Sequence, residues 1–364
     1  MNKKTRIIAI AAAVAASILI ITSPSHPIIF PKPNARSAGT EAVQVVAEDL
    51  QKPWAMGFGG NKIFFTEKGG NLMAVDNGTL VKEPVAHLKV ADVTDAGLLG
   101  IAVDPDFGKN HFIYVYYTYG EGNHLWNRVS RITVEGNKMA ASSVILDKIP
   151  GAEFDDGGVI KFGPDGKLYV GTGDASNQSS SQDLNSLAGK ILRINGDGSI
   201  PRDNPFPNSP VYSYGMRDPQ GLTWDGKGLL YEAEDGPTRN DEINLIQPGQ
   251  NYGWPATECA GSRQYRASLD CFNPSIGPAG LDYYAEGKLD MKNSLLMATL
   301  LGHGIYKMIL QNGTITGQNI IFDGVGRIRD VDEGPDGYLY VLTSNTDGMG
   351  FPASHDDKLL RIVR

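Results

Sequence analysis

The sequence has few cysteines and histidines, and it lacks the short motifs of several large enzyme classes. Only 2 cysteines and 6 histidines occur in 364 residues, and none has the spacing of a zinc site. There is no Gly-x-Ser-x-Gly elbow, no phosphate-binding loop and no dinucleotide fingerprint. The chemistries that depend on these motifs are therefore not expected.

Positive charge is also scarce. The 33 Lys and Arg residues are outnumbered by 41 Asp and Glu residues, which gives a net charge of −8, and the basic residues are scattered. Because nucleic-acid binding needs a concentrated positive surface, we expect no nucleic acid as a partner.

No apolar run reaches the length of a comfortable membrane span, which is about 20 residues. A basic start is followed by the uncharged run Ile7–Ile21, which has 15 residues, and then by several prolines. We predict a signal peptide or membrane anchor in residues 1–22, a Pro-rich linker in 23–40 and the folded region in 41–364. A buried N-terminal helix is the alternative. The pattern favours an exported, extracytoplasmic protein, with membrane attachment only through this segment.

The two cysteines lie close together in the sequence. Cys259 and Cys271 are twelve positions apart, and in an oxidising compartment we expect them to form one loop disulfide. Two unpaired, buried thiols are the alternative.

Glycine, in contrast, is abundant, with 44 of 364 residues, where about 7% is usual. It recurs in a phrase made of a turn with Asp, Pro or Gly, a short apolar strand, a loop and a second strand. Six copies follow one another at intervals of roughly 40 to 70 residues, and they begin near Gly59, Asp104, Gly163, Asp225, Leu295 and Gly334.

Repeats of this length that each supply several strands are typical of β-propellers. We therefore predict an all-β fold, a six-bladed β-propeller of four-stranded antiparallel blades, with a two-sheet sandwich as the alternative. The segment Glu41–Leu50 is predicted to pair with the C-terminal blade and close the ring. Propellers bind ligands at one end of the central channel, so the polar loops beside the repeated strands are the candidate sites.

Two aspartates are candidates for acid–base or metal chemistry. Asp155 precedes one predicted strand, and Asp174 ends the next. If both strand ends face the channel, the carboxylates could lie close together, and their repulsion would leave one protonated or both on a cation. Such a pair suits a general base or a metal ligand. An ordinary turn is the alternative.

Two arginine-containing segments suit anion binding. One loop holds Arg217, Asp218 and Gln220, and the planar guanidinium of Arg217 suits a carboxylate. A surface ion pair between Arg217 and Asp218 is the alternative. Arg327 and Arg329, at i and i+2 of a strand, would point to one face, where two cations need an anion between them. Two exposed arginines are the alternative there.

The turn Glu234–Pro237 is rich in carboxylates and exposed carbonyls. Oxygen ligands of this kind suit a hard cation such as Ca²⁺. A solvated acidic turn is the alternative.

Together these phrases resemble the soluble glucose/sorbosone dehydrogenase family over nearly all of residues 41–364. Members of that family are six-bladed propellers that use pyrroloquinoline quinone (PQQ) and calcium to oxidise aldose sugars. The resemblance is carried by residues 97–107, 155–174, 189–194, 214–221, 241–246, 251–255 and 327–331.

The resemblance implies a sugar as the small-molecule substrate and a separate electron acceptor as a partner. It also implies a role for several residues in holding the cofactors. The cofactor-binding positions are Arg217, Asp218, Gln220, Arg327 and Arg329, and the calcium carbonyls are those of Gly236 and Pro237.

The chain departs from the family pattern at the reaction centre. Asp155 stands where the family has its catalytic histidine, and Asp174 keeps the place of the carboxylate that orients this histidine. Leu301 replaces a cofactor-binding lysine, Asp95 replaces a glutamine near the quinone, and Asp218 replaces an asparagine. An acidic site binds a trianionic cofactor less well.

Two functions are therefore open on the sequence. In the favoured one, a PQQ- and calcium-dependent aldose dehydrogenase passes hydride from sugar C1 to the quinone, with Asp155 as the base beside Asp174. In the other, quinone binding is lost, and the propeller is a calcium-dependent lactonase or a non-catalytic ligand-binding protein.

Overall fold

The repeated Asp-Gly phrase forms the same local unit in different parts of the chain. In the computed structural model, which describes residues 43–285 and 287–364, the turn at Asp165 places Gly166 at φ +70°, a conformation that glycine adopts without strain. The Asp165 carboxylate accepts hydrogen bonds from the Tyr169 hydroxyl and the Arg193 guanidinium. The same contacts recur in another blade between Asp336, Tyr340 and Arg361. The sequence repeat therefore corresponds to a turn that is hydrogen-bonded to the two strands that follow it.

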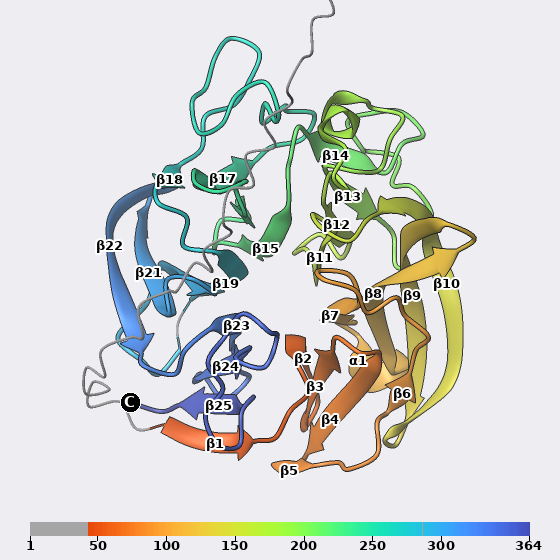
Figure 1. Ribbon diagram of the computed structural model, residues 1–364, viewed down its shortest axis with the longest axis vertical. Coiled ribbons are helices and arrows are strands. Elements are labelled where there is room, and N and C mark those ends of the chain that lie inside the picture. Colours follow the sequence, from red (N-terminus) through yellow and green to blue (C-terminus); the bar gives the residue numbers. More distant parts are fainter. Residues whose placement is uncertain (1–42, 286) are drawn as a thin grey trace, which may run out of the picture. The chain divides into compact units, whose positions relative to one another are not determined.

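The described residues form six antiparallel sheets arranged around a central channel (Figure 1). The innermost strand of each blade lines the channel. These strands are β2 (Pro53–Gly59), β7 (Leu98–Val103), β11 (Gly157–Phe162), β15 (Pro219–Trp224), β19 (Pro278–Tyr284) and β23 (Ile328–Glu333).

The second and third strands of each blade carry the repeated phrase, and each of the six copies falls in a different sheet. The second strands are β3 (Lys62–Glu67), β8 (Phe112–Glu121), β12 (Leu168–Thr172), β16 (Leu230–Glu234), β20 (Ser294–Thr299) and β24 (Leu339–Thr343). The third strands are β4 (Asn71–Asp76), β9 (His124–Glu135), β13 (Lys190–Ile194), β17 (Asp241–Ile246), β21 (Gly304–Gln311) and β25 (Leu359–Ile362).

The outermost strands are more exposed than the inner ones. They are β1 (Val43–Ala47), β10 (Lys138–Gly151), β14 (Val211–Tyr214), β18 (Asp270–Phe272) and β22 (Thr314–Asp323), with the two short strands β5 (Thr79–Leu80) and β6 (Ala86–His87) sharing the outer position of one blade. A one-turn helix α1 (Phe107–Asn110) and a 3₁₀ helix η1 (Gln178–Gln182) complete the elements of the described residues.

The ring is closed by the two ends of the described chain. Strand β1 pairs with β25, with Val43 opposite Ile362 and Val45 opposite Leu360. The predicted six-bladed propeller and its closing strand are therefore confirmed, and the two-sheet sandwich is excluded. Apolar side chains of neighbouring blades form the core between the sheets.

The N-terminal predictions lie largely outside the described residues. This holds for the signal or anchor segment 1–22 and for the linker 23–40. Within 43–285 and 287–364, no helix has the length and apolar character needed to cross a membrane.

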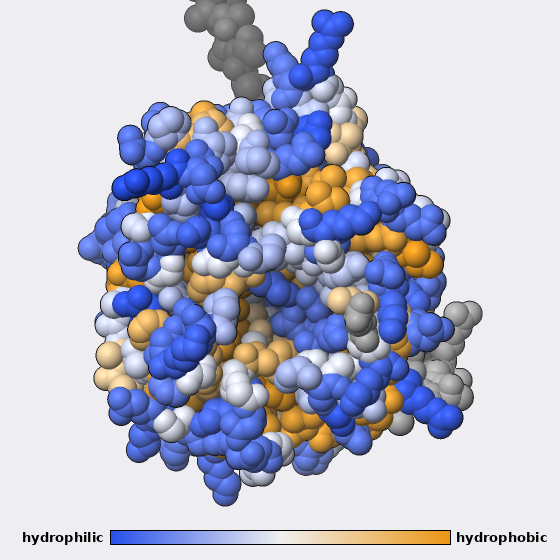
Figure 2. All heavy atoms as spheres, turned by 180° about the vertical axis from the view of Figure 1, so that it is seen from behind, coloured by the Kyte–Doolittle hydropathy of each residue, from blue (hydrophilic) through white to orange (hydrophobic). Residues whose placement is uncertain are grey.

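The central channel is partly filled by charged side chains. Its cavity has a volume of about 340 Å³, and the space-filling view shows a hollow with hydrophilic residues at the middle of the ring (Figure 2). Lys161 lies in it, with its ammonium 2.9 Å from Asp282 and 3.0 Å from Asp332. The channel wall therefore combines apolar side chains with a smaller group of charged ones.

Candidate active site

The loops at one end of the channel carry most of the residues singled out from the sequence. The first two strands of each blade are antiparallel, so the start of the first and the end of the second lie at the same end of the ring. Asp155 and Arg217 precede first strands, and Asp174 follows a second strand. We call this end of the channel the mouth.

Arg217 is the centre of the contacts at the mouth. Its Nη2 donates to Asp155 Oδ1 at 2.6 Å, and its Nη1 donates to the carbonyl oxygens of Asp235 at 2.8 Å and Gly236 at 3.1 Å. The ion pairs of Arg217 are therefore with Asp155 and, at 3.7 Å, with Asp235 Oδ2, and not with its sequence neighbour Asp218. Asp218 is buried and accepts a hydrogen bond from Gly157 N at 2.8 Å, which ties the Arg217 loop to the Asp155 loop.

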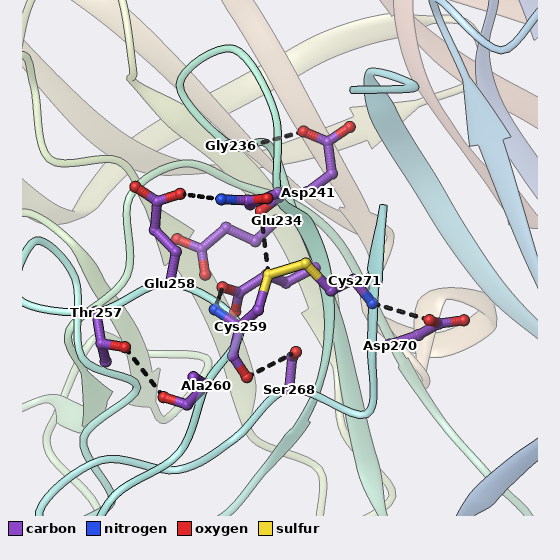
Figure 3. The surroundings of a disulfide bond; sticks show 12 residues. Glu234, Gly236, Asp241, Thr257, Glu258, Cys259, Ala260, Ser268, Asp270 and Cys271 are labelled. Carbon is purple, nitrogen blue, oxygen red and sulfur yellow. Dashed lines mark hydrogen bonds between the residues drawn. A yellow bond between two sulfur atoms is a disulfide. The ribbon is translucent and has the colours of Figure 1, made fainter. Parts of the chain in front are cut away.

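The Gly236 turn is held from behind by a carboxylate. Gly236 N donates to Asp241 Oδ1 at 3.0 Å, and Pro237 follows on the exposed side of the turn. The predicted disulfide between Cys259 and Cys271 is present, with a Cα–Cα distance of 5.8 Å, and it lies next to this turn (Figure 3). The carbonyl of Gly236 thus already faces a cationic group, the Arg217 guanidinium.

Asp174 lies behind the ion pair. It is buried, its Oδ2 accepts from the indole Nε1 of Trp254 at 2.8 Å, and its Oδ1 has no hydrogen-bond partner within the described residues. Its backbone N donates to Arg217 O at 2.7 Å, and Ala175 N donates to Asp155 O at 2.9 Å. The loops of Asp155, Asp174 and Arg217 therefore meet at one place.

The other two arginines differ in their partners. Arg327 is buried and paired with Asp347, with Nη2 2.8 Å from Oδ2, and its Nη1 donates to Leu300 O at 3.1 Å. Arg329 has no ion pair among the residues that the structure describes. Its Nη2 donates to Gln220 Oε1 at 2.7 Å, and its guanidinium lies over the Trp54 ring at 4.1 Å. The Nε of Arg329 is buried and has no hydrogen-bond partner among the described residues.

Burial changes the protonation of the acids at the mouth. It raises the pKa of Asp155 above the usual value; Arg217 opposes this rise, and the charges of Asp174 and Asp95 add to it. Burial also raises the pKa of Asp174, and it raises that of Asp235 to about 7. The pKa of Asp218 is raised well above its usual value by burial first and then by Asp235. The site therefore holds several carboxyl groups that take up protons more readily than carboxyls in water.

Several residues at the mouth were not found from the sequence. Lys68 follows strand β3, and its pKa is lowered by burial and raised again by Asp95 and Asp92. Trp54 contacts Arg329 from strand β2, and Trp254 and Asp347 contact Asp174 and Arg327 from other loops. Trp254 lies within residues 251–255, one of the segments that carry the family resemblance, and Lys68 carries a weaker signal, which is a basic residue directly after a repeated strand.

Comparison with known proteins shows which family the chain belongs to. The family model described as Glucose / Sorbosone dehydrogenase matches residues 50–352. The chain is 30% identical to the aldose sugar dehydrogenase YliI of Escherichia coli K12 over 343 residues, which cover 85% of this chain and 91% of that protein. It is 34% identical to the quinoprotein glucose dehydrogenase B of Acinetobacter calcoaceticus over 58% of this chain and 52% of that one. Among solved structures, the PQQ-bound form of the aldose sugar dehydrogenase from Streptomyces coelicolor superposes with a TM-score of 0.80 at 34% identity, over 91% of this chain and 99% of that chain. The chain thus belongs to the glucose/sorbosone dehydrogenase family.

Proposed function

We propose that this protein is an aldose sugar dehydrogenase that depends on PQQ and calcium, and that Asp155 is its catalytic base. The observation that carries the proposal is the half-buried Arg329, whose Nη2 donates to Gln220 and not to a carboxylate, and whose buried Nε has no partner within the described residues. Burial lowers its pKa to about 10. Such a cation gains most from an anionic ligand.

The residues at the mouth fit the quinone and the metal ion. Arg329 and Lys68 offer positive charge to a flat polycarboxylate, and Trp54 offers an aromatic face beside it. The carbonyl groups of Gly236 and Pro237 would hold calcium once the Arg217 guanidinium turns away from the Gly236 carbonyl. When bound, the quinone would supply the hydride acceptor, and calcium would supply a positive charge that favours the transfer.

The chain's own residues would bind the sugar, orient it and move a proton. Asp155 is half-buried and held by Arg217, so its second carboxylate oxygen is the group that takes the proton from the sugar C1 hydroxyl. Asp174 would keep the site negative and favour the protonated form of Asp155 after the transfer. Trp254 would fix Asp174 through its indole N–H.

The test is direct. Purified protein is mixed with Ca²⁺ and micromolar PQQ, the quinone absorbance is followed, and dye reduction is then measured with a set of aldoses. We expect a spectral change and dye reduction. No spectral change at micromolar quinone would overturn the proposal.

A matched pair of variants tests the residue that carries the argument. Arg329→Met should weaken quinone binding by about tenfold or more. Arg361→Met is the control, because Arg361 is also a strand arginine over an aromatic ring, at 4.4 Å from Tyr338, but it is paired with Asp336 in the repeated turn. Equal effects of both substitutions would contradict a role of Arg329 in the cofactor site.

The ion pairs of two arginines at the mouth favour a second candidate function. Arg217 and Arg327 are already neutralised by Asp155 and Asp347, as expected for a calcium-dependent lactonase or a ligand-binding propeller that has lost the quinone. The same titration separates the two, because such a protein would bind Ca²⁺ without any change in the quinone spectrum.

The setting of the reaction is part of the proposal. We propose an exported, extracytoplasmic protein, with a disulfide between Cys259 and Cys271 that suits an oxidising compartment. A sugar would be its substrate and a separate electron acceptor its redox partner, and membrane attachment, where it occurs, would run through the N-terminal segment.

A further inference from the structure

Lys190 is a fully buried lysine without a counter-ion. Its exposed fraction is 0%, and within the described residues no carboxylate lies at ion-pair distance from it. Its Nζ donates instead to three backbone carbonyls, Ser180 O at 2.7 Å, Ser181 O at 3.1 Å and Ala188 O at 2.6 Å. The three N–H groups of an ammonium are thus matched by three acceptors.

An arrangement of this kind is unusual for a lysine. Burial without a counter-ion disfavours the charged form, and it lowers the pKa of Lys190 to about 7, with the charge of Asp183 acting in the opposite direction. An apolar side chain of the same length would avoid this cost. The three carbonyls that accept from Lys190 indicate the role of its charge. Two of them come from near the start of one loop and one from near its end, so the ammonium links the two parts of this loop.

That loop, residues 177–189, contacts the Arg217 loop from behind. Ser181 Oγ donates to Met216 O at 2.6 Å, Gly215 N donates to Ser181 O at 3.0 Å, and Met216 N donates to Gly189 O at 3.2 Å. A side chain at Gly189 would collide with Ser181 and Met216 O. The residue before Arg217 is therefore fixed by the segment that Lys190 organises.

The same loop also fixes the tryptophan behind Asp174. Gln182 Nε2 donates to Trp254 O at 2.7 Å, and Trp254 N donates to Gly215 O at 3.0 Å. The indole of Trp254 donates to Asp174, and Arg217 lies over its ring at 5.9 Å. Through these two sets of hydrogen bonds, the loop contacts the segments that hold Arg217 and Trp254, next to Asp155 and Asp174.

We infer that Lys190 is a positioning residue of the mouth: its ammonium holds the loop 177–189 in the shape that sets Arg217 and Trp254 against Asp155 and Asp174. It touches neither substrate nor cofactor. This inference rests on the proposed function for its effect on catalysis, but its structural part can be measured without quinone.

The experiment compares Lys190→Met with Arg193→Met in the full chain. Arg193 lies on the same strand, β13, and is also buried, but it contacts Asp165 in the repeated turn and Asp203 and Asn204 in the loop after β13, and not the mouth. Amide hydrogen exchange is measured by mass spectrometry at one pH without cofactor. We expect Lys190→Met to raise exchange at least tenfold in residues 177–189, 214–218 and 250–256, and Arg193→Met to leave these segments as in the wild type.

Titration and kinetics with PQQ and Ca²⁺ follow on the same proteins. Lys190→Met should lower kcat at least tenfold and weaken quinone binding, with a smaller change in the KM for the sugar. Lys190→Gln keeps two N–H donors, so its kcat and quinone affinity should lie between those of Lys190→Met and the wild type. It replaces Lys190→Met in the comparison if Lys190→Met does not fold.

The outcomes separate the two claims. Unchanged exchange in the three segments, or the same change in Arg193→Met, overturns the positioning role. Raised exchange with unaltered kcat and quinone affinity overturns it as well. A wild type that binds no quinone refutes the proposed function, while the exchange comparison still decides whether Lys190 organises the mouth.

Discussion

The guanidinium of Arg217 lies 2.6 Å from the carboxylate of Asp155, across 62 positions of sequence. The same guanidinium contacts the carbonyl of Gly236. The proposed base and the proposed calcium carbonyl are therefore joined by one side chain. A ligand that binds the Arg217 guanidinium would weaken its ion pair with Asp155, and a substitution that removes the Asp155 charge would leave Arg217 available to a ligand.

Asp155→Asn separates the two roles of this carboxyl. The amide keeps the shape but cannot take a proton, so we expect kcat to fall by about 10²-fold or more. Quinone affinity should hold or rise, because Arg217 loses a competing anion. Dye reduction gives kcat, and absorbance titration gives the quinone Kd. Unaltered turnover would rule out Asp155 as the base.

Asp347→Asn tests the second neutralised arginine. Asp347 Oδ2 accepts from Arg327 Nε at 2.9 Å, and Asn keeps the oxygen that accepts from Met349 N. The freed charge of Arg327 should tighten quinone binding by about five- to tenfold, the range of one partly buried charge-assisted contact. A weaker quinone affinity in this variant would mean that Asp347 orients Arg327 and does not compete for it.

The fold could be predicted from the sequence because its signals are local. A turn such as Asp165–Gly166, with the following Tyr169 and Arg193, recurs at Asp336 with Tyr340 and Arg361 and needs no partner outside its own blade. Even the closing strand followed from this logic, since one blade lacks an outer strand until the N-terminal end supplies it.

The candidate site was predicted only in part, because its partners are distant in sequence. The loops of Asp155, Asp174 and Arg217 could be placed at one end of the ring by strand direction alone. The pairing of Arg217 with Asp155, and of Arg327 with Asp347, depends on loop conformations that no repeat encodes. Trp254 reaches Asp174 from a loop of another blade; its segment, 251–255, was noted in the sequence, but its contact with Asp174 depends on the fold.

The pH dependence of turnover should show the environment of Asp155. A base must be ionised to act, and burial raises the pKa of Asp155, so the acid limb of kcat lies at higher pH than for an aspartate in water. Turnover therefore rises with pH through this limb. Asp174→Asn removes a charge that raises the pKa of Asp155, so the limb should move to lower pH.

The control for this profile lies within the same variant. The amide oxygen that Asp174→Asn introduces can still accept from Trp254 Nε1, so the loop should keep its shape, and kcat on the plateau above the limb should change little. A limb that stays in place would show that Asp155 does not titrate in the rate-limiting step.

Glu232 offers a prediction about stability. It is 0% exposed, its Oε2 accepts from Asn244 Nδ2 at 3.0 Å, and its Oε1 has no partner within the described residues. Burial, and then the charge of Glu234, raise the pKa of Glu232 well above its usual value. The folded protein therefore prefers this side chain protonated.

The sign of the effect follows from linkage. The pKa of Glu232 is higher in the folded than in the unfolded state, so its contribution to stability is complete below about pH 4.3, the usual value for glutamate, and is lost as pH rises towards the folded pKa. Glu232→Gln removes this ionisation. As pH rises, the free energy of unfolding of this variant should therefore increase relative to that of the wild type, by up to about 1.4 kcal/mol per pH unit. Denaturant unfolding at pH 5 and pH 8 with a chelator measures the difference, and Glu135→Gln is the exposed control. A difference that does not change with pH would mean that Glu232 is ionised in the folded protein, which the burial of its unpartnered oxygen argues against.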